Sequence, residues 1–180
     1  MTRRFFALAI LLISTGSVAQ QSEERRLTIG IKIFPHIVAV DQGLDHKLDS
    51  SRMIRLYLLT ETDTATATPI LEQMKKNIKE INGHAVYIDI IDVDNLASAD
   101  QATALFVTQP MSTHALNAIM AHAAERKILA FSPFTGDVEK GVTAGLFISS
   151  RIKPYFNVDS LKRTGIEIHE KLYRISKHYR

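Results

Sequence analysis

Runs of apolar residues alternate with polar segments along this 180-residue chain, and the spacing within the runs changes along the sequence. Short apolar runs bounded by polar or turn residues are typical of strands, and they occur at 53–60, 85–93, 103–108, 127–132, 142–149 and 151–157. Amphipathic segments with helical spacing lie between and after them. The pattern predicts an α/β fold: a single domain with a central mixed sheet flanked by helices and a C-terminal amphipathic helix.

Two of the predicted helices are marked by residues that start or end helices. The first has Thr68 as its cap, begins at Pro69 and ends at Asn82-Gly83, which tolerate a left-handed backbone. Its apolar face consists of Leu71, Met74, Ile78 and Ile81. The second helix follows Ser112, another cap residue, and buries Leu116, Ile119, Met120 and Ala123.

The last predicted helix has the clearest period and runs to the end of the chain. Asn157 or Asp159 can cap its start, and its apolar face consists of Leu161, Gly165, Ile168, Leu172, Ile175 and Tyr179. Because Gly165 lies on that face, we expect close packing against a neighbouring element. Pro154, in the preceding strand, predicts an edge strand because proline cannot donate to a sheet ladder.

The segment from Leu27 to Val40 is ambiguous. Leu27, Ile29, Ile31 and Ile33 alternate with polar or small residues, which is the period of a strand. Pro35 then interrupts whichever element is present. The polar stretch 41–52 that follows is predicted to be a loop.

The first 19 residues have the three parts of a secretory signal peptide. Arg3 and Arg4 precede an unbroken apolar run from Phe5 to Ile13, and Ser17-Val18-Ala19 supplies small residues before a cleavage site. We expect cleavage near Ala19 and a mature domain of residues 20–180 outside the cytoplasm. An uncleaved anchor and a buried first helix are the alternatives, and the choice between general and twin-arginine export stays open.

Charge and cysteine content narrow the function. Removing Arg3 and Arg4 with the leader lowers the net charge by two, from +3 to +1, so nothing favours nucleic acid as a partner. The sequence contains no cysteine, which excludes a lipid anchor on cysteine, a thiol nucleophile and a thiolate metal site. Because no later apolar run is long enough to span a bilayer, we expect no stable membrane insertion after cleavage.

The loop FSPFTGDVEKGV, residues 131–142, is the first candidate for chemistry. Ser132, Asp137 and Glu139 could form a hydrolase site, but the loop lacks a P-loop, a dinucleotide fingerprint and a nucleophile elbow. Turn residues dominate it, which is more typical of a structural corner. The seven histidines lack the spacing of metal ligands. We therefore predict no catalytic residues, no metal and no cofactor.

A second candidate is the edge where the strands end, because ligands of open α/β sheets bind at the carboxyl ends of strands. The polar residues there are Thr60, Glu61, Thr108, Gln109, Ser132 and Thr135. Together with Asp137, Glu139 and Lys140 of the loop, they are the predicted ligand or partner contacts. The competing interpretation is that loops are polar and that helix caps need hydroxyls.

From Phe131 onward the chain resembles the YfiR family of small periplasmic proteins. The residues that carry the resemblance are Gly141, Gly145, Asn157, Gly165-Ile166, Leu172 and Ile175. The resemblance covers most of the mature chain in layout and about fifty residues in motif. The chain departs from the family in having neither its disulfides nor its Trp-Pro after the first apolar segment, where IFPHIVAVD stands here. The first departure excludes redox control through disulfides. The second puts in doubt a partner surface built on that segment.

The resemblance implies a non-enzymatic regulator that binds the periplasmic sensor domain of an inner-membrane signalling protein. In the family that protein is a diguanylate cyclase, held inactive so that cyclic di-GMP signalling and biofilm formation fall; other membrane sensors also serve as partners. The resemblance also implies that the first apolar segment is helical. A small periplasmic solute-binding protein is the alternative function, and a homodimer stays open.

Overall fold

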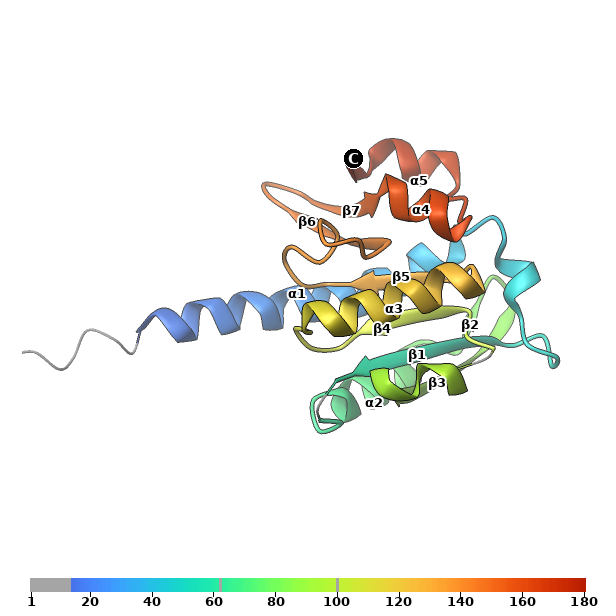
Figure 1. Ribbon diagram of the computed structural model, residues 1–180, viewed down its shortest axis with the longest axis horizontal. Helices are drawn as coiled ribbons and strands as arrows, with labels where there is room; N and C mark the ends of the chain where they lie inside the picture. Colours follow the sequence, from blue (N-terminus) through green and yellow to red (C-terminus); the bar gives the residue numbers. More distant parts are fainter. Residues whose placement is uncertain (1–13, 62, 100) are drawn as a thin grey trace, which may run out of the picture.

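The computed structural model describes residues 14–61, 63–99 and 101–180, and its centre is one mixed sheet of eight strands (Figure 1). The strand order is β2-β3-β1-β4-β5-β6-β7-β8. The five strands from β3 to β6 in this order are mutually parallel, β2 and β7 pair antiparallel with their inner neighbours, and β8 is parallel to β7. The bounds are β1 Ile54–Thr60, β2 Glu80–Ile81, β3 His84–Asp92, β4 Ala104–Val107, β5 Leu129–Ser132, β6 Ala144–Ile148, β7 Ile152–Asn157 and β8 Lys177–Tyr179. The predicted α/β fold with a mixed sheet is confirmed.

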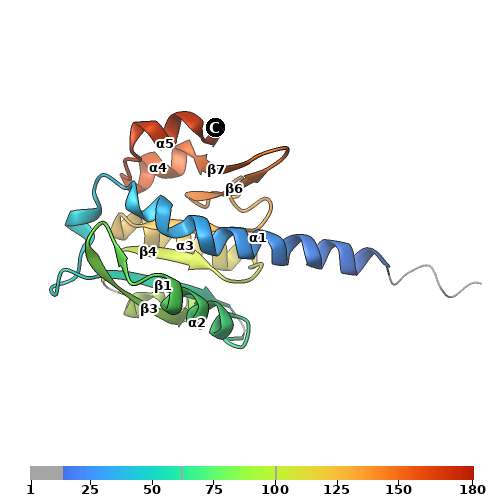
Figure 2. The same cartoon turned by 180° about the vertical axis from the view of Figure 1, so that it is seen from behind.

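Helices cover both faces of the sheet. α1 (Ser14–Ala39) and α2 (Ala67–Asn77) lie on one face, and α3 (Thr113–Arg126) and the short helix η2 (Val93–Ser98) lie on the other (Figures 1 and 2). Side chains of alternate residues on β1 point to opposite faces: Leu56 and Leu58 belong to the core under α1 and α2, and Leu59 belongs to the core under α3. Each face therefore has its own apolar core.

The segment Leu27–Val40 is helical almost to its end, because α1 continues to Ala39. Its buried residues are Ile31, Phe34, Ile37 and Val38, which recur at helical and not at strand spacing. The Phe34 ring lies 5.2 Å from that of Phe106 and 5.5 Å from that of Phe131, measured between centroids. The expectation that Pro35 interrupts the element was wrong. A proline inside a helix costs about 3 kcal/mol, and burial of these large side chains offsets it.

The helix that was predicted to begin at Pro69 ends earlier in the structure than its apolar pattern indicates. It begins at Ala67, so Thr68 lies inside it and bonds the Thr64 carbonyl instead of capping the helix. The helix ends at Asn77, and Ile78 already has an extended backbone. Ile81 is buried as predicted, but from strand β2. The predicted loop 41–52 contains a short helix, η1 (Leu44–Lys47), whose Leu44 is buried.

The two other predicted caps are confirmed. The Ser112 hydroxyl accepts a hydrogen bond from the Ala115 backbone N–H at 3.1 Å at the start of α3. The Asn157 side chain accepts one from the Ser160 N–H at 2.9 Å at the start of α4 (Val158–Thr164).

The C-terminal helix is present but broken, so its prediction as one continuous helix was wrong. α4 ends at Gly165, whose φ of +65° is left-handed, and α5 (Glu170–Ile175) follows after an extended segment. In that segment Ile168 forms a β-bridge with Asp41. A Cβ on Gly165 would meet no described atom within 4 Å, so this glycine terminates a helix instead of permitting close packing.

Strand β7 is not the edge strand that Pro154 predicts, because β8 pairs with it. The pairing covers only Tyr155 to Asn157, so the proline lies just before the paired part. The missing N–H of Pro154 therefore does not interrupt the ladder with β8.

The predicted leader falls mainly on residues 1–13, which lie outside the described residues, while Ser14–Ala19 form the start of α1. Among the helices of the described residues, none has the length and apolar character needed to cross a membrane.

Candidate functional site

The parallel strands β1, β4 and β5 end at the same edge of the sheet and bring three predicted site residues there. Thr60 and Ser132 are the last residues of β1 and β5, and Thr108 follows β4. All three are buried, and two of the hydroxyls donate to backbone carbonyls: Thr108 to Leu59 at 2.7 Å and Thr60 to Ile91 at 3.5 Å. These two hydroxyls join neighbouring strands.

Glu61, one residue after β1, contacts the start of helix α3. Its carboxylate accepts hydrogen bonds from the backbone N–H of Ser112, at 2.7 Å, and from the Ser112 hydroxyl. A negative charge at a helix N-terminus is stabilised by the unsatisfied N–H groups and the helix dipole. This residue therefore fixes α3 against the carboxyl end of the sheet.

Ser132 and Asp137 meet in the interior of the loop. The Ser132 Oγ donates to the Asp137 Oδ2 at 2.6 Å and accepts from the Phe134 N–H at 3.1 Å. Asp137 is only 3% exposed, and its burial raises the pKa of the carboxyl above its usual value, against the opposing effects of Ser132 and Lys140. A nucleophile must reach its substrate, and Ser132 is 0% exposed. The pair therefore stabilises the loop from inside.

We name residues 133–142, between β5 and β6, the corner loop. Its backbone is held from the junction of β7 and α4: the Asn157 side-chain amide donates to the Val138 carbonyl at 2.8 Å, and the Ser160 hydroxyl donates to the Gly141 carbonyl at 2.6 Å. The exposed side chains are those of Thr135, Glu139 and Lys140. The corner loop is thus a rigid turn with a polar tip.

Arg26 of α1 ties this corner to the N-terminal helix and was not among the predicted site residues. Its Nε donates to the Pro133 carbonyl at 2.6 Å, and its Nη2 donates to the Leu146 carbonyl at 2.7 Å. Burial lowers the pKa of the guanidinium, although the carboxylates of Glu23, Glu139 and Asp137 favour its charge. The only sign of Arg26 in the sequence is the charged run 23–26, and such a run is equally typical of a solvent-exposed chain end.

A groove of about 400 Å³ opens where α1 passes the carboxyl ends of the strands. It brings together the predicted residues Thr108 and Gln109 with side chains from α1 and from the corner loop. We call it the edge groove; its lining is Gln20, Glu23, Glu24, Leu27, Thr66, Thr108, Gln109, Pro110 and Phe134. Of the other predicted residues, the hydroxyl of Thr135 reaches the Glu23 Oε1 at 3.3 Å.

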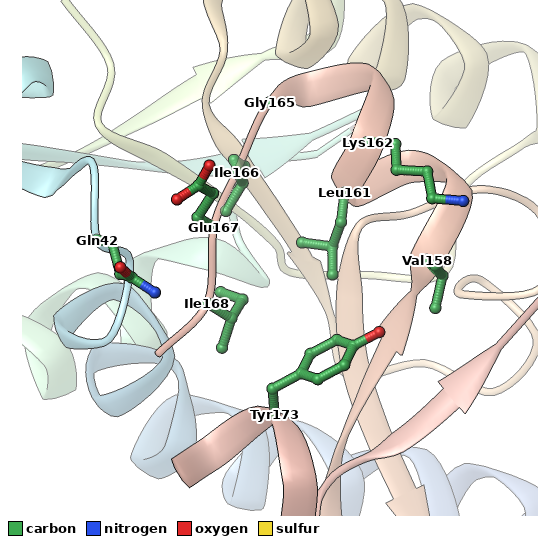
Figure 3. Close-up of a pocket in the computed structure, with 9 residues that line it drawn as sticks. All are labelled: Gln42, Val158, Leu161, Lys162, Gly165, Ile166, Glu167, Ile168 and Tyr173. Carbon is green, nitrogen blue, oxygen red and sulfur yellow. The ribbon is translucent and has the colours of Figure 1, made fainter. Parts of the chain in front are cut away.

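A second pocket, of about 560 Å³, lies between α4, the extended segment 165–168 and α5 (Figure 3). Leu161 of α4 and Tyr173 of α5 face each other across it, and Gln42 and Glu167 lie at its far side (Figure 3). The Gln42 N–H donates to the Glu167 carbonyl at 2.8 Å, which fixes that wall. The pocket is mainly apolar and could accept an apolar side chain of another protein.

We looked for a metal site among the side chains that the structure describes. There, no group of three or more histidine, aspartate or glutamate side chains is placed to hold an ion.

Three comparisons with known proteins add to this geometry. Residues 45–177 match a family model described as YfiR/HmsC-like, DUF4154. No curated protein matches the chain.

Several solved structures have a similar fold. A conserved domain protein from Vibrio cholerae is 14% identical, with a TM-score of 0.56 over 78% of this chain and 60% of that one. A ligand-free, open substrate binding protein with adhesive properties from Clostridium difficile is 16% identical, with a TM-score of 0.56 over 84% and 58%. An ABC domain in complex with L-Trp from Streptococcus pneumonia is 14% identical, with a TM-score of 0.52 over 79% and 61%. The chain spans about three fifths of each of these structures, and at such identities the likeness shows the fold alone.

Proposed function

The chain belongs to the YfiR/HmsC-like family, and from that membership we propose that it is an exported regulator that binds the periplasmic sensor domain of a membrane signalling protein. The family is one of periplasmic, non-enzymatic regulators. The burial of Ser132, which takes its hydroxyl out of reach of a substrate, is in keeping with a binding role. Family membership is the observation that carries the proposal.

The partner we propose is a membrane diguanylate cyclase. Binding of its sensor domain holds the cyclase inactive, so that cyclic di-GMP and biofilm formation fall. The leader is removed near Ala19, and the mature protein acts in the periplasm. No disulfide can gate the interaction, because the sequence has no cysteine.

The contact surface we propose is the tip of the corner loop. Of the predicted contacts on the loop, Thr135, Glu139 and Lys140 are exposed, whereas Ser132 and Asp137 are buried. Their backbone is rigid, so binding costs little ordering entropy. Opposite charges on neighbouring residues 139 and 140 suit a polar partner surface, where charge complementarity determines specificity.

A membrane pull-down tests the proposal. The mature protein should recover a membrane protein with a periplasmic sensor domain, and deletion of the gene should raise cyclic di-GMP. The double variant Glu139→Arg, Lys140→Glu should lose the recovered protein, whereas the matched variant Glu72→Arg, Lys76→Glu on the exposed face of α2 should keep it. Recovery of nothing by the native protein, with cyclic di-GMP unchanged on deletion, would refute the role.

A second role, binding of a small solute, is favoured by one observation. The edge groove lies at the carboxyl ends of parallel strands, where open α/β sheets bind ligands, and contains Thr108 and Gln109. Its volume lies within the range of small-molecule sites. A thermal-shift screen of sugars, amino acids, amines and organic anions tests this role, because a ligand at 100 times its Kd adds about 2.7 kcal/mol of stability.

A further inference from the structure

The chemistry of the edge groove indicates which solute it would take. Its walls are mainly apolar and include Leu27 of α1, Pro110 and Phe134. Phe134 is itself largely buried, so its ring is held in place by the core. Such walls bury the apolar body of a ligand and contribute about 25 cal/mol for each Å² removed from water.

The charged groups around the groove are mainly acidic. Glu23 and Glu24 line it directly. Asp137 and Glu139 lie close enough to act on Arg26, the guanidinium that neighbours Glu23. The cations near these carboxylates are already engaged: Arg26 donates to two backbone carbonyls, Lys140 pairs with Asp137, and Arg163, beside Gly141, donates to the Ser160 hydroxyl. The charged side chains that line the groove are those of Glu23 and Glu24, so the groove itself favours a positive charge over a negative one.

Glu23 supplies the most specific observation. Its Oε1 accepts a hydrogen bond from the Thr135 hydroxyl at 3.3 Å. Its Oε2 is buried and has no hydrogen-bond partner within the described part of the chain. An enclosed carboxylate oxygen without a donor costs free energy, and most such atoms in folded proteins are paired. Because Glu23 lines the groove, a ligand N–H that reaches this carboxylate on a small movement of the side chain would satisfy the oxygen.

We propose that the edge groove binds a small apolar molecule that carries a protonated amine. The amine donates to the Glu23 carboxylate, and the apolar body lies against Leu27, Pro110 and Phe134. The inference rests on the solute-binding role and not on the regulatory one. An organic acid of the same size finds no cation in the lining, and an amino acid brings a carboxylate beside Glu23 and Glu24.

Three probes with the same aromatic ring and different charge test the proposal by isothermal titration. They are 2-phenylethylamine, L-phenylalanine and 3-phenylpropionate. The protein is recovered from the exporting cell, and its first residue is read by N-terminal sequencing. The amine is expected to bind at least tenfold more tightly than the acid, with the zwitterion between them.

Variants locate the amine at Glu23. Glu23→Gln should weaken amine binding at least tenfold and should not weaken binding of the acid, because a negative charge in the lining is removed. Glu72→Gln, an exposed carboxylate on α2, should change neither. Leu27→Ala should weaken all three probes together, since it shortens the apolar wall.

Equal binding of amine and acid, or an amine affinity that Glu23→Gln leaves unchanged, would overturn the inference. If the acid or the zwitterion binds best and Leu27→Ala weakens it, the solute-binding role stands and only the ligand class is wrong. If no probe binds and the thermal-shift screen is flat, both the ligand class and the solute-binding role fall.

Discussion

The backbone of Gly145 on β6 lies so close to the carbonyl oxygen of Ser132 that a Cβ atom on Gly145 would stand 2.6 Å from it. The same atom would lie 2.6 Å from the Val138 Cγ2 of the corner loop. Strand β6 therefore approaches the end of β5 and the loop together, and only glycine leaves enough space. The resemblance that the sequence shows to its family at Gly145 thus has a steric cause.

Gly145→Ala is expected to destabilise the fold by about 3 kcal/mol, because overpacking against backbone forces a main-chain shift. Urea denaturation measures the loss. Gly136→Ala is the matched control: its φ is +86°, but its Cβ would meet no described atom within 4 Å. It should cost only about 1 kcal/mol, the strain of a left-handed alanine. Equal losses of unfolding free energy in the two variants would contradict steric crowding at Gly145.

Arg26→Met should detach the N-terminal half of α1, since both hydrogen bonds to the Pro133 and Leu146 carbonyls are lost. Hydrogen bonds to a charged group contribute about 1.5–3 kcal/mol each, so we expect faster amide exchange over residues 22–29. Arg25→Met is the control, because Arg25 is exposed. Unchanged exchange in Arg26→Met would mean that α1 is held by its apolar face alone.

Asp137 should make stability fall as the pH rises. Its folded-state pKa is raised by burial, so the fold favours the protonated carboxyl; the contribution is present below the unfolded pKa and is lost as the pH rises through the folded one. Asp137→Asn stays neutral and should flatten this decline. The free energy of unfolding of both proteins, compared at each half unit between pH 3 and 7, isolates the effect. A constant difference between them would contradict it.

Asp49 should have the opposite effect on stability, which its carboxylate should increase as the pH rises. Its carboxylate accepts hydrogen bonds from the Met53 and Ser51 N–H groups and from Arg55, and these lower its pKa, with the Met53 bond the largest cause. Its stabilising contribution is present above the unfolded pKa and is lost as the pH falls through the folded one. Asp49→Asn should therefore destabilise more at pH 7 than at pH 3. Thermal melting at the two pH values checks the sign.

Gly165→Ala distinguishes the continuous helix that the sequence predicts from the broken helix of the structure. In the continuous helix that the apolar period predicts, alanine would stabilise by about 1 kcal/mol. In the structure Gly165 has a φ of +65° and ends α4, so alanine should instead destabilise by about 1 kcal/mol. The change in urea midpoint has opposite signs in the two cases.

The elements that local rules govern were predictable. Ser112 and Asn157 cap their helices as expected, because a cap depends on neighbours three residues away. The β-α alternation likewise places Thr60, Thr108 and Ser132 at one edge of the sheet.

The predictions that were wrong concern elements whose structure depends on contacts with residues distant in sequence. Ile31 and Ile33 alternate like strand residues, but the helix is decided by Phe34, which packs against rings on β4 and β5. Ile168 keeps helical register in sequence, yet it pairs with Asp41, which follows α1 much earlier in the chain. The site shows the same limit: Arg26 and Glu23 reach the corner loop only through the tertiary fold.

The hydrogen bonds of Arg26 also bear on the order in which the chain matures. Their acceptors lie 107 and 120 residues further along, in Pro133 and Leu146. A polypeptide emerges from the ribosome with its N-terminus first, so α1 has no surface to dock on until most of the protein has been made. In the exported protein that we propose, this delay leaves the leading segment free for the export machinery while the rest of the chain is still being synthesised.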